Sequence, residues 1–259
     1  AGDYLASVGE SLREYPPALY LMASVKYSLG ELEQAQKHAE SYLAQVPENP
    51  SGLGLLGGIH LRNGKPLRAI EVLERADRGA PENFGILMLL GNAYMAAGQY
   101  ENASAAFEKG RQLNPDNELL RTQAAISQLG LGQRDKAVAN LEELLTVGSQ
   151  SRQAAFALIL THLRDGNPDA ALKVVDQLEK SITDSPLPRY FRADIMRVKG
   201  NYDASLRGMR EILTSTPDFL PAKLGLAGLH IEMGNLVQAT ATLDEVLATN
   251  PKHPAALMA

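Results

Sequence analysis

The sequence predicts an all-α solenoid built from helix–turn–helix repeats, and three regularities carry that prediction. Seven glycines follow one another at a constant spacing of 34 residues: Gly30, Gly64, Gly98, Gly132, Gly166, Gly200 and Gly234. A small residue, Ala or Ser, stands five positions after each of them. Pro stands seventeen positions after five of the seven, as Pro47, Pro81, Pro115, Pro217 and Pro251. A fixed period of this length indicates a stack of similar structural units.

Each period predicts a helix, a turn and a second helix. In the third period Leu87, Leu90 and Tyr94 recur at spacings of three and four, as on one face of an amphipathic helix. Gly98 is expected to end that helix, because the left-handed conformation at a helix C-terminus costs Gly least. Pro115 is expected to close the second helix, because Pro is tolerated at a helix start but not inside. The same punctuation gives seven 34-residue units: 16–49, 50–83, 84–117, 118–151, 152–185, 186–219 and 220–253.

The two ends of the chain are predicted to lie inside further units. Residues 1–15 are expected to be the second helix of a truncated preceding unit, because Gly2, Asp3 and Tyr4 match the turn chemistry of later periods. Residues 254–259 are expected to begin the first helix of a truncated eighth unit. A helical pair cannot cover its own apolar face, so cut ends leave apolar surface that permits end-to-end self-association.

The third unit resembles the tetratricopeptide repeat. The residues that carry the resemblance are Leu87 at the Trp place of the family pattern, Leu90-Gly91, Tyr94, Ala103, Phe107 and Pro115. At the Trp place the units instead hold Leu19, Leu53, Leu87, Arg121, Ala155, Arg189 and Lys223. The resemblance implies a right-handed superhelical solenoid whose first helices line a concave groove. Small residues at the Gly91 and Ala103 places should let the two helices approach closely. The seam between them should be filled by Leu73, Phe107, Leu141, Val175, Met209 and Leu243.

Composition limits the kinds of function. The formal net charge of −5 argues against nucleic acid as the main partner, because such binding depends on Lys and Arg that neutralise phosphates. No apolar stretch approaches the roughly 18 residues of a membrane span, so no direct membrane span is expected. The absence of Cys excludes thiol catalysis and Cys-ligated metals, and it fits the cytoplasm and the bacterial periplasm equally well.

No cofactor, metal site or catalytic residue is predicted. His60, His162 and His230 occupy the Tyr94 place of units that are not adjacent, so a shared metal is implausible and a packed ring is the favoured interpretation. The carboxylates lie mostly at helix starts and on second helices, where the helix dipole and solvent favour them. We therefore expect the protein not to be an enzyme.

The resemblance places partner-binding residues on the groove side of the first helices. Carried over by position, they are Tyr20, Tyr27, Arg62, Met88, Asn92, Met95, Phe156, Arg164, Tyr190, Asp194 and Arg197. This aromatic and Met-rich lining with scattered charges suits the apolar side chains of a peptide. Arg192 stands where the family usually has Leu. Either it pairs with a carboxylate of the adjacent unit, which we favour, or it faces the groove and binds an acidic partner.

The sequence thus favours a non-catalytic scaffold that binds a peptide or helix of a partner protein in the concave groove. The alternative is a structural spacer in a multiprotein complex, without a dedicated peptide groove. The Gly-Asn-Tyr and Gly-Gln-Tyr turns and Asn-Pro connectors resemble those of long bacterial tetratricopeptide proteins, often lipoproteins, of exopolysaccharide assembly and envelope protein sorting. That likeness favours the bacterial periplasm or envelope over the cytoplasm.

Overall fold

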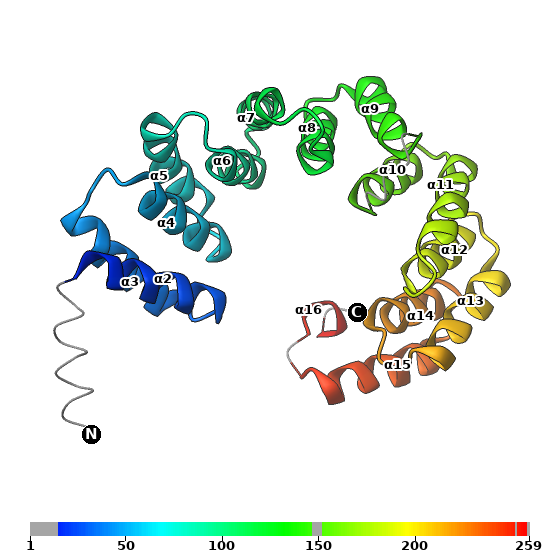
Figure 1. Ribbon diagram of the computed structural model, residues 1–259. Helices are drawn as coiled ribbons and strands as arrows, with labels where there is room; N and C mark the ends of the chain where they lie inside the picture. The colour runs from blue at the N-terminus through cyan, green and yellow to red at the C-terminus, as the bar shows by residue number, and fades with distance from the viewer. Residues whose placement is uncertain (1–14, 147–151, 252, 258–259) are drawn as a thin grey trace. The chain divides into compact units, whose positions relative to one another are not determined.

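The structure, a computed structural model, describes residues 15–146, 152–251 and 253–257. Within these ranges every regular element is a helix, which confirms the predicted all-α class (Figure 1). The chain divides into two compact bodies, the first ending at Asn140 and the second beginning at Leu141. The helix predicted in residues 1–15 lies almost entirely outside the described residues. None of the described helices is both long and apolar enough to cross a bilayer.

The first body contains four first helices and their successors. They are α2 (Pro16–Ser28), α3 (Leu32–Gln45), α4 (Pro50–Arg62), α5 (Pro66–Gly79), α6 (Phe84–Ala96), α7 (Tyr100–Leu113), α8 (Glu118–Gly130) and most of α9 (Arg134–Thr146). Helix α2 packs on α3, α4 on α5 and α6 on α7, and each second helix packs on the next first helix. This alternation makes one continuous core along the body.

The second body continues the same alternation. Its helices are α10 (Arg152–Arg164), α11 (Pro168–Ser181), α12 (Leu187–Val198), α13 (Tyr202–Ser215), α14 (Leu220–Glu232), α15 (Leu236–Thr249) and the short α16 (Pro254–Leu257). Helix α10 packs on α11, α12 on α13 and α14 on α15, while α11 and α13 pack on the following first helices.

The period-marking glycines end the first helices as predicted. All seven have positive φ, between 66° at Gly64 and 78° at Gly30. At Gly30 the backbone N–H donates to the Tyr27 carbonyl at 3.1 Å, and the N–H of Glu31 donates to the Lys26 carbonyl at 2.9 Å. These two bonds form a Schellman motif, which satisfies carbonyls that the end of the helix leaves unpaired.

Asparagines at the same period start three of the first helices. The side chains of Asn49, Asn83 and Asn117 accept hydrogen bonds from the backbone N–H groups three residues later, at 3.0, 3.1 and 3.0 Å. Each is an N-cap that satisfies one of the unpaired N–H groups of the first turn.

Small residues on the first helix and large ones on the second interlock in the seam. Leu73, Phe107, Leu141, Val175 and Met209 are fully buried, as predicted, whereas Leu243 is only half-buried. A Cβ added to Gly57 would lie 2.4 Å from Leu73 Cγ, and one added to Gly91 would lie 2.4 Å from Phe107 Cε1. The close approach of the two helices therefore requires the smallest residue at this place when the facing side chain is Leu73 or Phe107.

Candidate functional site

Consecutive first helices touch one another within each body. Helix α2 contacts α4 and α4 contacts α6 in the first body, and α12 contacts α14 in the second. A ring contact between Phe156 and Phe191 joins α10 to α12. We call the surface carried by α2, α4 and α6, and by α10, α12 and α14, the first-helix face of each body. It carries the residues that the sequence assigned to partner binding.

Tyr27 and Arg62 form a joint between α2 and α4. Arg62 Nη1 donates to the Tyr27 carbonyl oxygen at 2.7 Å, and its guanidinium carbon lies 4.8 Å from the centre of the Tyr27 ring. The ring itself lies against Gly58, where an added Cβ would be 3.3 Å from the Tyr27 hydroxyl oxygen. A cation over an aromatic face is attracted to its negative quadrupole, so these two residues hold neighbouring units together.

The other predicted partner-binding residues of the first body also pack against neighbouring side chains. The Tyr20 ring lies 5.5 Å from the Tyr42 ring of α3. Met88 and Met95 are partly buried against the hydrophobic core, and Asn92 is half-buried. Much of this part of the first-helix face is therefore occupied by packing between the units.

Four aromatic rings run across the first helices of the second body. We call Phe156, Phe191, Tyr190 and Phe219 the aromatic row. Successive ring centres lie 5.1, 5.8 and 6.0 Å apart, and the last two contacts are edge-on. All four are half-buried, so each presents part of its ring to solvent. Edge-on and tilted pairs at these separations are the favoured aromatic geometries. The row joins α10, α12 and the residue before α14.

Charged side chains lie beside the aromatic row. Arg197 Nε donates to Asp194 Oδ1 at 2.8 Å, and Arg197 Nη1 donates to Glu232 Oε1 of α14 at 2.6 Å. Burial raises the pKa of Tyr190, and the nearby Asp194 carboxylate raises it further, so Tyr190 stays a neutral hydrogen-bonding group. Arg164, at the end of α10, is exposed and forms no ion pair within the described part of the chain.

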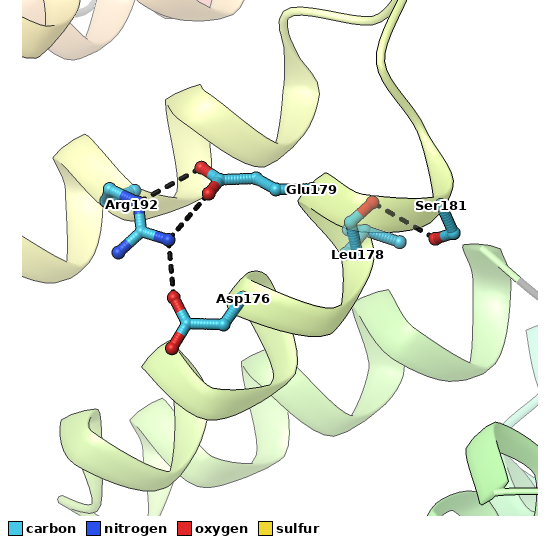
Figure 2. A network of polar contacts seen from close by, with 5 residues as sticks. All are labelled: Asp176, Leu178, Glu179, Ser181 and Arg192. Atoms are coloured by element: carbon cyan, nitrogen blue, oxygen red, sulfur yellow. Dashed lines mark hydrogen bonds and ion pairs between the residues drawn. The ribbon is translucent and has the colours of Figure 1, made fainter.

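Arg192 pairs with two carboxylates of the preceding unit. Its Nε donates to Glu179 Oε1 at 3.0 Å and its Nη2 to Glu179 Oε2 at 2.7 Å, while Nη2 also donates to Asp176 Oδ1 at 2.6 Å (Figure 2). The hydrogen bond with Glu179 and then that with Asp176 raise the pKa of Arg192, although burial opposes the rise. The favoured interpretation of Arg192, pairing across the unit boundary, is confirmed. The two-pronged contact with Glu179 uses the planar fork that Arg offers and Lys does not.

Two of the three histidines at the Tyr94 place are buried, and the third, His162, is half-buried. His60 and His230 are buried, and the Nδ1 atom of each has no hydrogen-bond partner among the described residues. Burial lowers the pKa of both, which keeps them neutral. Tyr94 instead donates from its hydroxyl to Glu74 Oε1 at 2.7 Å, and burial with this bond raises its pKa to about 12. In the ranges the structure describes, no three His, Asp or Glu side chains are grouped to hold a metal ion.

Three residues of the first-helix face of the second body were not predicted from the sequence, namely Phe191, Phe219 and Glu232. Phe191 and Phe219 are not at the repeat positions that the resemblance assigned to the groove. Glu232 lies 35 residues after Arg197, and the same separation joins Tyr27 to Arg62. Two residues that are 35 positions apart, which is one period plus one residue, therefore meet across adjacent first helices in both cases. This spacing could have predicted the contact between Arg197 and Glu232 from the sequence.

Comparison with protein families decides the identity of the repeat. Models of the tetratricopeptide repeat match residues 20–84, 60–126, 122–186 and 199–259. The chain belongs to the tetratricopeptide repeat family. A comparison with curated proteins by sequence gives no match.

Solved structures share the fold of this tetratricopeptide repeat protein at low sequence identity. A tetratricopeptide repeat protein from Parabacteroides merdae superposes with a TM-score of 0.74 at 17% identity, over 94% of this chain and 96% of its own. A thermophilic protein of the family from Thermus thermophilus gives 0.56 at 23% identity, over 70% and 98% of the two chains. YrrB, described as having an unusual peptide-binding site, gives 0.56 at 18% identity, over 71% and 95%. The family membership indicates a protein–protein interaction scaffold.

Proposed function

We propose that this protein is a non-catalytic scaffold whose first-helix face binds an extended segment or a helix of a partner protein. The observation that carries the proposal is the aromatic row, with Asp194, Arg197 and Glu232 beside it. Half-exposed rings offer large apolar contact area at small loss of side-chain freedom, and aromatic residues are enriched at binding hot spots. The flanking charges would orient polar groups of the partner.

The second body is the stronger candidate for the peptide contact. In the first body Tyr27 and Arg62 already bind each other, and Met88 and Met95 pack on the core. Arg164 in the second body has no ion pair among the described residues, so it is available to a carboxylate of a partner. We expect Arg164 to supply a polar contact to the partner.

The experiment is a selection of peptides from a random library on the immobilised chain, followed by affinity measurements with variants. Arg164→Glu should weaken the selected peptides at least tenfold. Lys173→Glu is the matched control, because Lys173 is also exposed, lies in the same unit and sits on the second helix α11. If both variants bind the selected peptides with equal affinity, the proposal that the first-helix face binds the partner is contradicted.

A structural spacer is the second candidate function. It is favoured by Tyr27, Arg62, Met88 and Met95 of the first body, which contact other residues of the chain. If the chain only holds assembly components apart, the library selection enriches no peptide. Substitutions on the first-helix face then leave the function of the assembly unchanged. Deleting one whole 34-residue unit then has the larger effect, because it shortens the array.

The cellular setting we propose is a bacterial envelope or exopolysaccharide-associated assembly, on the basis of the sequence likeness alone. The proposed partner is a protein and not a nucleic acid, given the net charge of −5. Fractionation of the tagged gene product in its own organism tests this setting. Recovery with the periplasm or membranes supports it, and recovery in the cytoplasm contradicts it.

End-to-end self-association remains a proposal for the apolar surface at the last complete unit. Leu236 is 62% exposed there, whereas the equivalent residue of the third unit, Tyr100, contacts Gly130 of the following unit. Sedimentation analysis across a concentration series tests it, with Leu236→Glu expected to shift the chain towards monomer, and an unchanged distribution contradicting it.

A further inference from the structure

A hollow of about 420 Å³ lies between α12 and α13. Its volume falls in the range of small-ligand pockets. We call it the α12–α13 hollow, and its lining residues are Arg189, Arg192, Ala193, Met196, Ala204, Arg207, Gly208 and Glu211. Apart from Arg192, for which an acidic partner was the alternative interpretation, none of them was considered for partner binding, and none belongs to the aromatic row.

Two small residues of α13 line the hollow in this unit. Ala204 and Gly208 are one helical turn apart, so they share a face of the helix. At the Ala204 place the other units hold Gln34, Arg68, Asn102, Lys136, Ala170 and Gln238. At the Gly208 place they hold His38, Val72, Ala106, Asn140, Val174 and Thr242. No other unit combines Ala with Gly at these two places. A Cβ on Gly208 would lie 3.0 Å from the Ala193 Cβ, so Gly208 lets α13 approach α12 closely beside the hollow.

The walls of the hollow are basic in an acidic protein. Residues 186–219 contain six Lys or Arg and four Asp or Glu, whereas the whole chain carries a net charge of −5. Arg192 is paired with the two carboxylates Asp176 and Glu179, so it is not available to a ligand. Arg189 and Arg207 are exposed, and neither forms an ion pair within the part of the chain that the structure describes.

The floor of the hollow is apolar. Ala193 is buried, Met196 is half-buried, and both lie beside Ala204 and Gly208. Glu211 is the single carboxylate of the lining, against the two available guanidinium groups of Arg189 and Arg207. The hollow therefore combines apolar lining residues with two guanidinium groups, of Arg189 and Arg207, that form no ion pair within the described residues.

We propose that the α12–α13 hollow is a second binding site, which takes an acidic segment of a partner protein. A Glu or Asp side chain of that segment is bound by the guanidinium groups of Arg189 and Arg207. A neighbouring aliphatic side chain lies on Met196 and the small residues of the floor. Arg binds carboxylates with two parallel hydrogen bonds, so planar geometry adds to charge in selecting this ligand. The pairing of Arg192 with α11 fixes one wall of the site before the ligand arrives.

The probe for this site is the blocked peptide acetyl-Asp-Leu-Glu-Leu-amide with a fluorescent label, measured by anisotropy on the whole chain at low salt. We expect saturable binding that weakens at least tenfold in the Arg189→Glu, Arg207→Glu double variant. Arg68→Glu with Arg78→Glu is the matched control, since both arginines are exposed on α5 and the charge change is the same. The control should bind within twofold of the native chain.

A second variant tests the shape of the hollow without changing its charge. Ala204→Gln introduces the residue that the first and seventh units carry at this place, and we expect it to weaken the probe at least tenfold. Circular dichroism spectra establish that each variant keeps its helix content. The neutral peptide acetyl-Asn-Leu-Gln-Leu-amide should bind at least tenfold more weakly than the acidic one. Absence of binding by the native chain, equal binding of the two peptides, or unchanged binding by either site variant overturns the proposal.

Discussion

Replacing Gly91 by Ala tests how the two helices of a unit pack. A Cβ at this place would lie 2.4 Å from Phe107 Cε1, far inside the contact distance of two carbon atoms. Phe107 is fully buried, so its ring can move only by displacing neighbouring side chains. Overpacking of a core costs about 1–3 kcal/mol, whereas Gly to Ala inside a helix gains about 0.5–1 kcal/mol. We therefore expect Gly91→Ala to lower the free energy of unfolding by on the order of 1 kcal/mol.

A compensating change separates this clash from any other effect of the substitution. The fourth unit carries Ala125 and Leu141 at the same two positions of the sequence. The double variant Gly91→Ala with Phe107→Leu recreates that pair in the third unit. We expect it to be more stable than the sum of the two single changes predicts, because the two residues share one contact.

The assay is urea unfolding followed by circular dichroism, together with hydrogen exchange of the α6 and α7 amides. In a repeat array each unit contacts only its neighbours, so the loss of protection should be centred on these two helices. The reasoning is refuted if Gly91→Ala is as stable as the native chain, or if the two changes add independently.

Three further predictions concern single contacts. Arg192→Met leaves Asp176 and Glu179 without their cation, so the unfolding free energy should fall by about 1 kcal/mol at low salt and by less at high salt; an equal loss at both salt concentrations contradicts the ion-pair account. Asn83→Ala removes the N-cap that binds the Ile86 N–H and should cost about 1 kcal/mol, seen as faster amide exchange in the first turn of α6. Burial holds the pKa of His60 in the folded chain below its ordinary value of 6.5. As the pH falls, His60 is therefore protonated at a higher pH in the unfolded chain than in the folded chain. The free energy of unfolding should fall as the pH drops below 6.5. Gln is the residue that the fourth unit carries at this place, as Gln128. His60→Gln should therefore weaken the pH dependence of the unfolding free energy measured in urea. An unchanged pH profile would show that His60 is not responsible for it.

The fold could be predicted from the sequence because its determinants are local and repeated. A glycine every 34 residues needs a left-handed backbone in every unit, and Gly30 to Gly234 all have it. Small and large residues at facing places, such as Gly91 and Phe107, already define a seam before any coordinates are known. The period places each residue on a face without a three-dimensional search.

The candidate site could be predicted only in outline. The period places Arg197 on the first-helix face, but whether its side chain turns to solvent or to Glu232 depends on the separation of α12 and α14. The row from Phe156 to Phe219 depends in the same way on distances between units. The α12–α13 hollow is lined by the small residues Ala204 and Gly208, and whether small residues leave space or allow close packing depends on the side chains that face them.

The central claim is that a partner binds on the first helices, and amide hydrogen exchange with a library-selected peptide bound tests it most directly. The exchange rates of the free and peptide-bound chain are compared helix by helix. The account predicts added protection at the exposed edges of α10, α12 and α14 around the aromatic row, with α11 and α15 unchanged. Protection confined to the second helices, or none at saturating peptide, would contradict it.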